Sequence, residues 1–224
     1  MKKSIGAISG KIPAADTRKR LINSSLAIFA KHGYAGASTR MLASAAKVNL
    51  AAIPYYFGGK EGLYHAVVRR IVEFGKEKIF PEMEKIRQRL ETGNPAHAEL
   101  LEMLERLIGN YVDLVTKEET IHLAPIMFQE QLHPSKAFQI FYDDLLRHEH
   151  KLCTALVARL LKIPPESKEA ILHAHAIFGH VMIFLAGRAL ILKRLDAEKF
   201  SKEDSALIHK ILKQHVRMIF NSQQ

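Results

Sequence analysis

Apolar residues recur at helical spacing along most of the chain. From residue 95 to the end, no stretch keeps the alternation of period two that a half-buried strand requires. The pattern predicts a helix at 16–31, then a helix, a tight turn and a short helix over 38–60, and further helices at 60–90, 96–116, 121–132, 136–162, 166–194 and 202–220. We therefore expect an all-α protein.

The segment Ser38–Lys60 has the pattern of a helix-turn-helix. Ser38 and Thr39 provide hydroxyls that can accept hydrogen bonds from the free N–H groups at a helix start. Ala43 and Ala46 are small enough for two helices to cross closely. In this motif the second helix enters the major groove of DNA. The alternative is an ordinary helical hairpin in an all-helical protein.

The distribution of charge favours the DNA-binding interpretation. The chain carries a net charge of +10, and its first 70 residues hold twelve Lys and Arg against Asp16 and Glu61, whereas the remainder holds twenty-one of each sign. The whole excess lies around the helix-turn-helix, as a polyanionic partner requires. Arg18, Lys19 and Arg20 oppose the dipole of the first helix, so we interpret them as phosphate contacts.

The composition indicates a reducing compartment. The single cysteine, Cys153, lies in an apolar helical pattern and fits a buried structural thiol better than a redox sensor. The N-terminus lacks the apolar core of a secretory signal. The most apolar run, 181–192, is interrupted by Arg188 and is too short to span a bilayer. These features predict a cytoplasmic protein without a membrane partner.

The order of these pieces resembles the TetR family of transcriptional regulators. The motifs that match are Phe29-Ala30 with Gly33-Tyr34, Ser38-Thr39 with Leu42-Ala43, Ala45-Ala46 with Val48, Tyr55-Tyr56-Phe57, and Lys60-Glu61 with Leu63-Tyr64. The run Pro125–Ser135 also resembles the C-terminal domain of the CecR-like branch. The resemblance implies a homodimer whose C-terminal helices bind a small molecule and whose two N-terminal domains bind a palindromic operator.

Three regions are expected from this reading. Residues 1–14 form a flexible basic arm, which either adds phosphate contacts or is an unstructured tail. Residues 15–76 form the helix-turn-helix DNA-binding domain. Residues 77–224 form a larger helical domain for ligand binding and dimerisation, separated into helices by loop signals such as 91–95.

Two positions depart from the family pattern. Lys47 stands at the turn position usually given to Gly, where a left-handed Lys costs roughly 1 kcal/mol. Pro54 lies inside the short recognition helix and lacks an N–H. Either that helix bends at Pro54 or it starts so late that little is lost.

We expect the DNA contacts to come from both helices of the motif. Ser38, Thr39 and Lys60 stand at helix starts suited to phosphates, and Arg40 and Lys47 can reach the backbone or guanine edges. For the tyrosines, packing against the first helix is the alternative. The predicted set is Ser38, Thr39, Arg40, Lys47, Asn49, Leu50, Ala51, Pro54, Tyr55, Tyr56 and Lys60.

The C-terminal half offers a pocket and a dimer face. Aromatic and polar side chains predict a cavity lined by His122, Phe128, Gln129, Phe138, Phe141, Tyr142, Phe178 and Arg188. Small and apolar stripes on the last two long helices predict a four-helix bundle between two copies, through His175, Gly179, Met182, Ala186, Ile208, Leu212, Val216 and Ile219. Intramolecular core packing is the alternative for each stripe and each pocket residue.

The function predicted is that of a ligand-responsive repressor, neither an enzyme nor a cofactor-binding protein. A helical small-molecule or metal-dependent enzyme with an incidental helix-turn-helix is the alternative. His173 and His175 are about 200° apart around their helix and cannot both face one ion with His180, so no metal site is expected. A membrane-surface protein is a third alternative, but the basic segment lacks a large apolar face.

Overall fold

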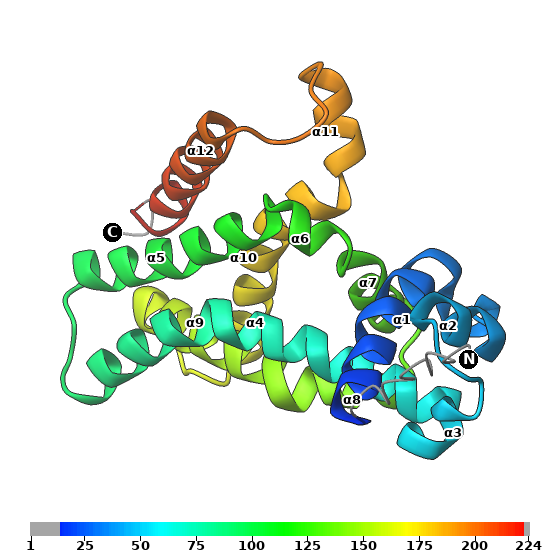
Figure 1. Cartoon of the computed structure of the whole chain (residues 1–224). Helices are drawn as coiled ribbons and strands as arrows, with labels where there is room; N and C mark the ends of the chain where they lie inside the picture. Colours follow the sequence, from blue (N-terminus) through cyan, green and yellow to red (C-terminus); the bar gives the residue numbers. More distant parts are fainter. Residues whose placement is uncertain (1–13, 222–224) are drawn as a thin grey trace, which may run out of the picture. The chain divides into compact units, whose positions relative to one another are not determined.

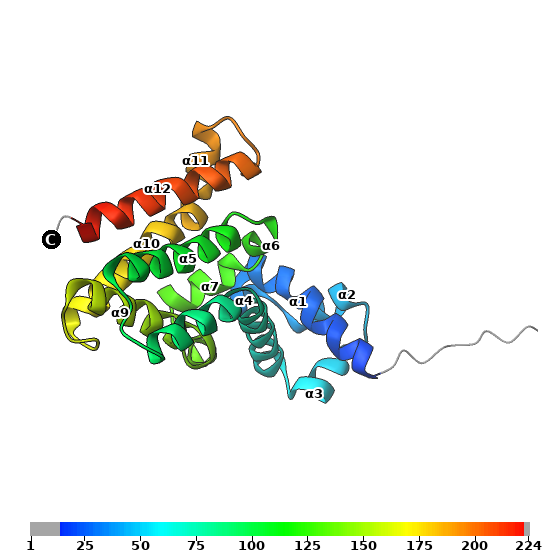
Figure 2. The same cartoon turned by 90° about the vertical axis from the view of Figure 1, so that its left-hand side faces the viewer.

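The computed structural model describes residues 14–221, and every regular element among them is a helix (Figures 1 and 2). The predicted all-α fold is therefore confirmed, whereas the predicted basic arm lies almost entirely outside the described residues. The chain divides into two compact units, Met1–Val67 and Val68–Gln224. We refer to them as the N-terminal and C-terminal units.

The N-terminal unit consists of three helices and the start of a fourth: α1 (Ala14–Gly36), α2 (Thr39–Ala46), α3 (Ala52–Phe57) and α4 (Lys60–Glu91), which continues into the C-terminal unit. Its small core is closed by fully buried side chains from each of these helices, namely Leu21, Phe29, Leu42, Ile53 and Leu63. The ring of Phe29 meets the edge of Tyr64 with 4.9 Å between centroids. This aromatic contact joins the end of α1 to the first turns of α4.

The first helix is interrupted at Gly33, as predicted. The range Ala14–Gly36 given for α1 joins two helical segments across a kink at this residue. Gly33 has φ 66° and ψ 175°. The positive φ expected at this glycine is present, but its ψ is extended rather than left-handed helical.

The C-terminal unit contains the rest of α4 and the helices α5 (His97–Val115), α6 (Glu118–Ile121), α7 (Ala124–Leu132), α8 (Lys136–Phe141), the π-helix η1 (Tyr142–Leu146), α9 (Arg147–Leu161), α10 (Lys168–Ala186), α11 (Arg188–Arg194) and α12 (Lys202–Asn221). One apolar core includes buried residues of α4, α5, α9, α10 and α12. Glu105 of α5 is buried and accepts from Arg217 Nε at 2.5 Å. This ion pair ties α12 to α5.

Several predicted helices are interrupted in the structure. The predicted helix 166–194 breaks between α10 and α11 at Gly187, where an added Cβ would lie 2.9 Å from the carbonyl oxygen of Ile183. The predicted helix 136–162 holds the five-residue π-helix η1. The spacing of apolar residues in the sequence does not reveal either interruption, because the segments on both sides keep an apolar face.

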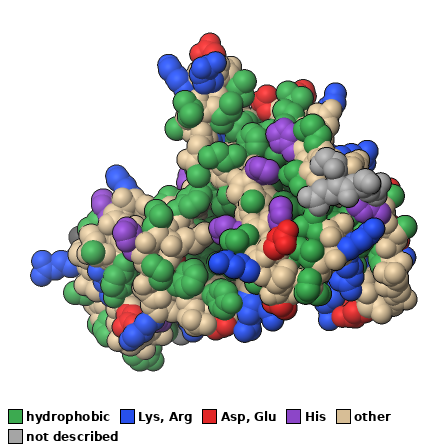
Figure 3. Space-filling view, turned by 180° about the vertical axis from the view of Figure 1, so that it is seen from behind, with side chains coloured by type: hydrophobic (Ala, Val, Ile, Leu, Met, Phe, Trp, Pro, Cys, Tyr) green, Lys and Arg blue, Asp and Glu red, His purple; other side chains and the backbone are tan. Residues whose placement is uncertain are grey.

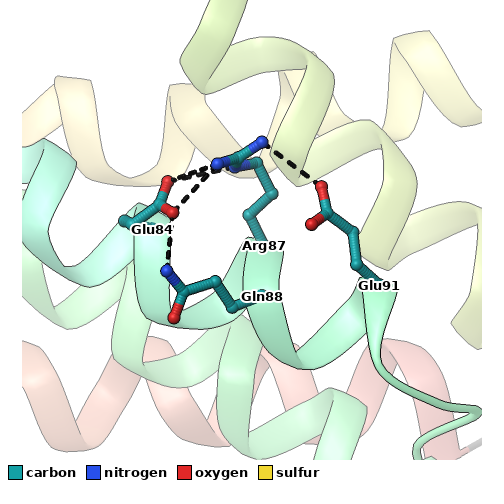
Figure 4. Close-up of polar contacts among 4 residues, drawn as sticks. All are labelled: Glu84, Arg87, Gln88 and Glu91. Carbon is teal, nitrogen blue, oxygen red and sulfur yellow. Dashed lines mark hydrogen bonds and ion pairs between the residues drawn. The ribbon is translucent and has the colours of Figure 1, made fainter.

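Pro81 does not interrupt α4, which is assigned as one helix from Lys60 to Glu91. The last turns of α4 carry a surface network in which Arg87 contacts Glu84 and Glu91, and Gln88 donates to Glu84 at 2.7 Å (Figure 4). Hydrogen bonds from Arg87 and Gln88 lower the pKa of the exposed Glu84. All four side chains belong to one helix at spacings of three and four, so the network supports helicity locally and connects no other element.

Candidate DNA interface and ligand cavity

The helix-turn-helix is shaped by two local backbone features. Ser38 has extended dihedral angles, and its Oγ accepts from the amide of Met41 at 3.2 Å, so it caps the start of α2. Lys47 follows α2 with φ 53° and ψ 47°, and its amide bonds back to carbonyls of the last turn. The predicted cap and the predicted left-handed Lys are both confirmed.

Pro54 is accommodated because α3 starts late. α3 begins at Ala52, so Pro54 is its third residue, where a backbone N–H has no partner inside the helix. The first amide to bond four residues back is that of Tyr55, which donates to the Ala51 carbonyl at 3.2 Å. Of the two alternatives for Pro54, the late start is the one found.

Most of the predicted DNA-contacting residues lie on the surface of the N-terminal unit. Tyr55 has 79% of its surface exposed and Leu50 has 44%, while Thr39, Tyr56 and Lys60 are half-buried. The remaining members are exposed, namely Ser38, Arg40, Lys47, Asn49, Ala51 and Pro54. Asn49 uses its side-chain oxygen within the turn, accepting from the Ala51 amide at 2.8 Å. A base contact from Asn49 would therefore rely on its amide nitrogen.

Arg20 has a structural role that the sequence interpretation missed. Its Nη2 donates to the carbonyl oxygen of Ala46 at 2.6 Å and to that of Lys47 at 3.2 Å. These oxygens end α2 and would otherwise lack intrahelical donors. The expectation that Arg20 contacts phosphate is thus replaced by a clamp from α1 on the turn of the motif, and no local pattern in the sequence indicates it.

Lys60 and Arg18 also make contacts inside the N-terminal unit. Lys60 Nζ lies 3.4 Å from the Ala35 carbonyl oxygen and 4.5 Å from the centroid of the Tyr34 ring. The guanidinium carbon of Arg18 lies 5.4 Å from the centroid of Phe57. Both cations are held by cation–π contacts near the motif.

The C-terminal unit contains a cavity of about 430 Å³. Its wall is mainly aliphatic and aromatic, with a few polar groups. The lining comprises Ile71, Phe74, Gly75 and Ile79 of α4, Tyr111, Leu114 and Val115 of α5, Thr120, Leu123, Met127, Phe128 and Gln131 around α6 and α7, Phe138, Tyr142, Leu145 and Leu146 of α8 and η1, Glu149 and His150 of α9, and His175, Phe178, Gly179, Val181, Met182 and Leu185 of α10. Size and composition suit a small, largely apolar molecule.

Four of the predicted pocket residues meet in this cavity: Phe128, Phe138, Tyr142 and Phe178. The other four lie elsewhere. His122 and Gln129 are exposed, and Phe141 is buried outside the lining. Arg188 is a correction to the expected polar anchor, because its Nη2 pairs with Glu118 at 2.5 Å and its guanidinium packs 4.7 Å from the Phe200 ring centroid.

The π-helix η1 supplies part of the cavity wall. The extra residue of a π turn rotates the side chains that follow it, and here Tyr142, Leu145 and Leu146 all line the cavity. A Cβ added to Gly75 of α4 would lie 2.8 Å from Leu145 Cδ2. A side chain at position 75 would therefore displace Leu145, which is part of the cavity wall.

Polar groups gather at one part of the cavity wall. Glu149 and Tyr111 are both buried, and neither Glu149 Oε1 nor the Tyr111 hydroxyl has a hydrogen-bond partner of ordinary geometry among the described residues. Burial raises the pKa of Glu149 to about 7, against a smaller lowering effect of the nearby Tyr111 hydroxyl. Burial lowers the pKa of His150, and the neighbouring His175 lowers it further. His150 is therefore a weak base in this setting.

The predicted dimer residues lie in different surroundings on α10 and α12. Ile208, Leu212 and Val216 are buried in the core, and Ile219 is half-buried against it, so the intramolecular alternative applies to this stripe of α12. His175, Gly179 and Met182 of α10 line the cavity. His175 and Gly179 are also exposed, as is Ala186. The cavity thus reaches the surface at α10.

An exposed apolar face nevertheless remains on α10 and α12. Leu172, Ile183, Leu207 and Met218 each expose more than half of their surface, and the rings of His180 and His215 connect the two helices at 6.1 Å. Figure 3 shows apolar and histidine side chains interspersed below the projecting α11. We call the exposed face formed by these six residues the α10–α12 face.

Within residues 14–221, α10 alone is long and apolar enough to cross a membrane by length and composition. In the structure, 28% of its most apolar window is buried. A single helix of this kind is weak evidence for a membrane span, and α10 also contributes Ala174, Ile177, Val181 and Leu185 to the apolar core. Residues 14–221 include no cluster of three or more His, Cys, Asp or Glu suited to a metal ion.

Burial raises the pKa of the Cys153 thiol to about 12, which fits the structural role expected for it.

These features are those of a helix-turn-helix protein whose second unit is an all-helical domain that encloses a cavity. Residues 21–67 match the model of the bacterial regulatory proteins of the tetR family, and residues 94–222 match that of the C-terminal domain of the HTH-type transcriptional dual regulator CecR. The CecR of Shigella flexneri is 32% identical to this chain over 208 residues, which is 93% of both proteins. The chain belongs to the TetR family and carries a CecR-type C-terminal domain.

Solved structures share the fold over most of the chain. HlyIIR, a hemolysin II transcriptional regulator, aligns with a TM-score of 0.59 at 20% identity, covering 90% of this chain and 99% of the other. AibR, solved in complex with isovaleryl coenzyme A and operator DNA, aligns with a TM-score of 0.59 at 14% identity, covering 91% and 98%. Identities this low show the likeness of fold alone.

The Arg20 clamp leads to a first prediction. Replacing Arg20 with Ala leaves the last carbonyls of α2 without their donor, so the free energy of opening α2 should fall by about 1–2 kcal/mol. Hydrogen exchange of the α2 amides measures this quantity. The matched control is Lys19→Ala, an exposed neighbour on α1. Equal protection of α2 in both variants would contradict the clamp.

The raised pKa of Glu149 leads to a second prediction. The folded protein holds a proton on Glu149 that the unfolded chain loses near pH 4.5, so stability should fall by about 3 kcal/mol as the pH rises from 4.5 through 7 and then level off. Glu149→Gln should remove this decline, while Glu198→Gln, at an exposed position, should keep it. Urea unfolding at pH 5 and pH 8 measures the difference. Identical pH dependence in Glu149→Gln and the parent would contradict the assignment.

Proposed function

We propose that this chain is a homodimeric repressor that binds a palindromic operator and is released when a small, largely apolar molecule enters the C-terminal cavity. The observation that carries the proposal is the presence in one chain of a well-formed helix-turn-helix and a cavity whose wall includes α4, the helix that also belongs to the N-terminal unit. A protein with this function acts in the cytoplasm, where the DNA is.

DNA docking uses the exposed residues of α2, the turn and α3. Arg40 and Lys47 supply positive charge, while Leu50, Pro54 and Tyr55 present an apolar surface that suits thymine methyl groups. Ser38 and Thr39, at the start of α2, meet a phosphate together with the backbone amides there. Few of these groups hydrogen-bond bidentately, so operator preference rests on apolar contact and DNA shape more than on a dense polar code.

Dimerisation uses the α10–α12 face. Four large apolar side chains exposed on two neighbouring helices form the kind of patch that a second copy covers. The cavity reaches the surface at His175 and Gly179, on the same helix. A partner seated on this face would lie near the cavity opening at His175 and Gly179. Binding of a ligand in the cavity would then change the contacts between the two copies.

Release follows from competition between two conformations. Ile71, Phe74 and Gly75 of α4 contact the cavity, and the same helix supplies Leu63 and Tyr64 to the core of the N-terminal unit. A ligand that favours one position of α4 shifts the population of DNA-competent dimers. CecR of Shigella flexneri is named a dual regulator. For this chain too, the position of the operator at each promoter would decide between repression and activation. AibR provides a precedent in the same fold for a protein seen with both a ligand and operator DNA.

The role of Lys60 gives a third prediction. Lys60→Ala should weaken binding to all DNA sequences and reduce the slope of log affinity against log salt by roughly one unit, because one phosphate contact is lost. Electrophoretic or anisotropy titrations over a range of salt concentrations measure the slope, and Lys210→Ala, at an exposed position of α12, is the control. An unchanged slope with a lower melting temperature would exclude the phosphate contact. Lys60 would then act only through its contacts with Ala35 and Tyr34.

The α10–α12 face gives a fourth prediction. Ile183→Glu places a charge on an apolar side chain that is 60% exposed and should weaken the dimer at least tenfold. Leu132→Glu, at a site 73% exposed on α7, is the matched control and should leave the dimer unchanged. Sedimentation velocity over a dilution series measures both. A dimer that resists Ile183→Glu would move the interface elsewhere.

A further inference from the structure

The described wall of the cavity holds an acidic side chain but no Lys or Arg. Among the described residues that line it, none is Lys or Arg, and the group able to carry a full negative charge is the Glu149 carboxyl. An acidic ligand would thus meet no cation in the wall, whereas the excess of basic side chains lies in the first 70 residues.

Glu149 is buried without adequate internal partners. The residue has only 5% of its surface exposed, and its Oε1 makes no hydrogen bond of ordinary geometry among residues 14–221. A buried carboxyl oxygen left in this state is costly and is normally explained by water, an ion or a ligand. The neighbouring Tyr111 hydroxyl is also buried and likewise makes no hydrogen bond of ordinary geometry among these residues.

The surroundings of this carboxyl suit an organic cation. The rings of Tyr111 and Phe178 meet edge to face at 5.1 Å, and the ring of His150 stacks on Phe178 at 5.8 Å. Aromatic faces beside a carboxylate attract an ammonium group and accept its alkyl substituents. The remaining wall, from Ile71 and Phe74 to Leu185, accepts the apolar body of the same molecule.

We propose that the effector is an apolar molecule bearing one basic nitrogen, whose protonated amine donates to Glu149 Oε1 inside the cavity. This inference rests on the proposed function, because it names the class of ligand for the same cavity. The Tyr111 hydroxyl donates to the same carboxyl and keeps it ionised in the complex. This pairing recovers part of the cost of burying the ligand charge, and the Tyr111 hydrogen bond to the carboxyl adds to it.

The test uses three probes that share one apolar body: 4-phenylbutylamine, 4-phenylbutan-1-ol and 4-phenylbutyric acid. Calorimetric titration of the full chain at pH 7.5 should give an affinity for the amine at least tenfold above that for the alcohol, and no detectable binding of the acid. Glu149→Gln should lose at least tenfold for the amine and less than threefold for the alcohol. Glu198→Gln, at an exposed site, should retain the parental preference.

Proton exchange provides a second readout that a merely structural role would not move. At pH 6, binding of the amine should release close to one proton, measured from the heats in buffers of different ionisation enthalpy, because Glu149 must ionise. The other ionisable groups around it are Tyr111 on α5, His150 and Cys153 on α9 and His175 on α10. Glu149→Gln should abolish the release, whereas proton uptake would point to a neutral acceptor ligand and overturn the proposal.

The outcomes separate this inference from the proposed function. Tightest binding of the acid or the alcohol, or an amine preference that survives Glu149→Gln, overturns the amine assignment while the cavity remains a ligand site. Failure of all three probes to bind at millimolar concentration counts against the cavity itself and overturns both. Binding of the amine without release of operator DNA supports the ligand class and contradicts the proposed release.

Discussion

One helix, α4, contributes to two cores, and the regulation proposed for this protein depends on that constraint. Its first two turns bury Leu63, Tyr64 and Val67 in the N-terminal unit, and its next turns present Ile71, Phe74 and Gly75 to the cavity. α4 is therefore an element shared by the cavity wall and the core of the N-terminal unit. At Gly75 the wall is tightly filled, because an added Cβ would lie 2.8 Å from Leu145 Cδ2 and the Leu145 side chain would have to shift.

The two units rely on different physics. The N-terminal unit is small, and its motif is held by single contacts: the Ser38 cap, the left-handed Lys47 and the Arg20 clamp. The C-terminal unit has a continuous apolar core, and it tolerates a buried Glu149 without adequate partners. Unsatisfied polar groups in an otherwise well-packed unit are expected at functional sites, where a ligand supplies what the fold omits.

Local features were the most predictable from the sequence. The Ser38 cap, the left-handed Lys47 and the positive φ of Gly33 each depend on a few neighbouring residues, so residue type and spacing suffice. Features that need a distant partner were missed: Arg20 reaches 26 residues along the chain to Ala46, and Arg188 pairs with Glu118 rather than lining the pocket. The α12 stripe was ambiguous for a similar reason. An apolar stripe such as Ile208, Leu212 and Val216 predicts burial but not whether the same chain or another covers it.

In the proposed function, the N-terminal unit reads a palindromic DNA sequence as part of a dimer. The most direct test is to select fragments of genomic DNA with the full-length protein at low salt and to sequence the bound pool. A twofold dimer should enrich one sequence made of two inverted half-sites at a constant spacing, since two copies related by a twofold axis must read the same half-site twice. A bound pool without any preferred sequence, or with single unpaired half-sites, would contradict it.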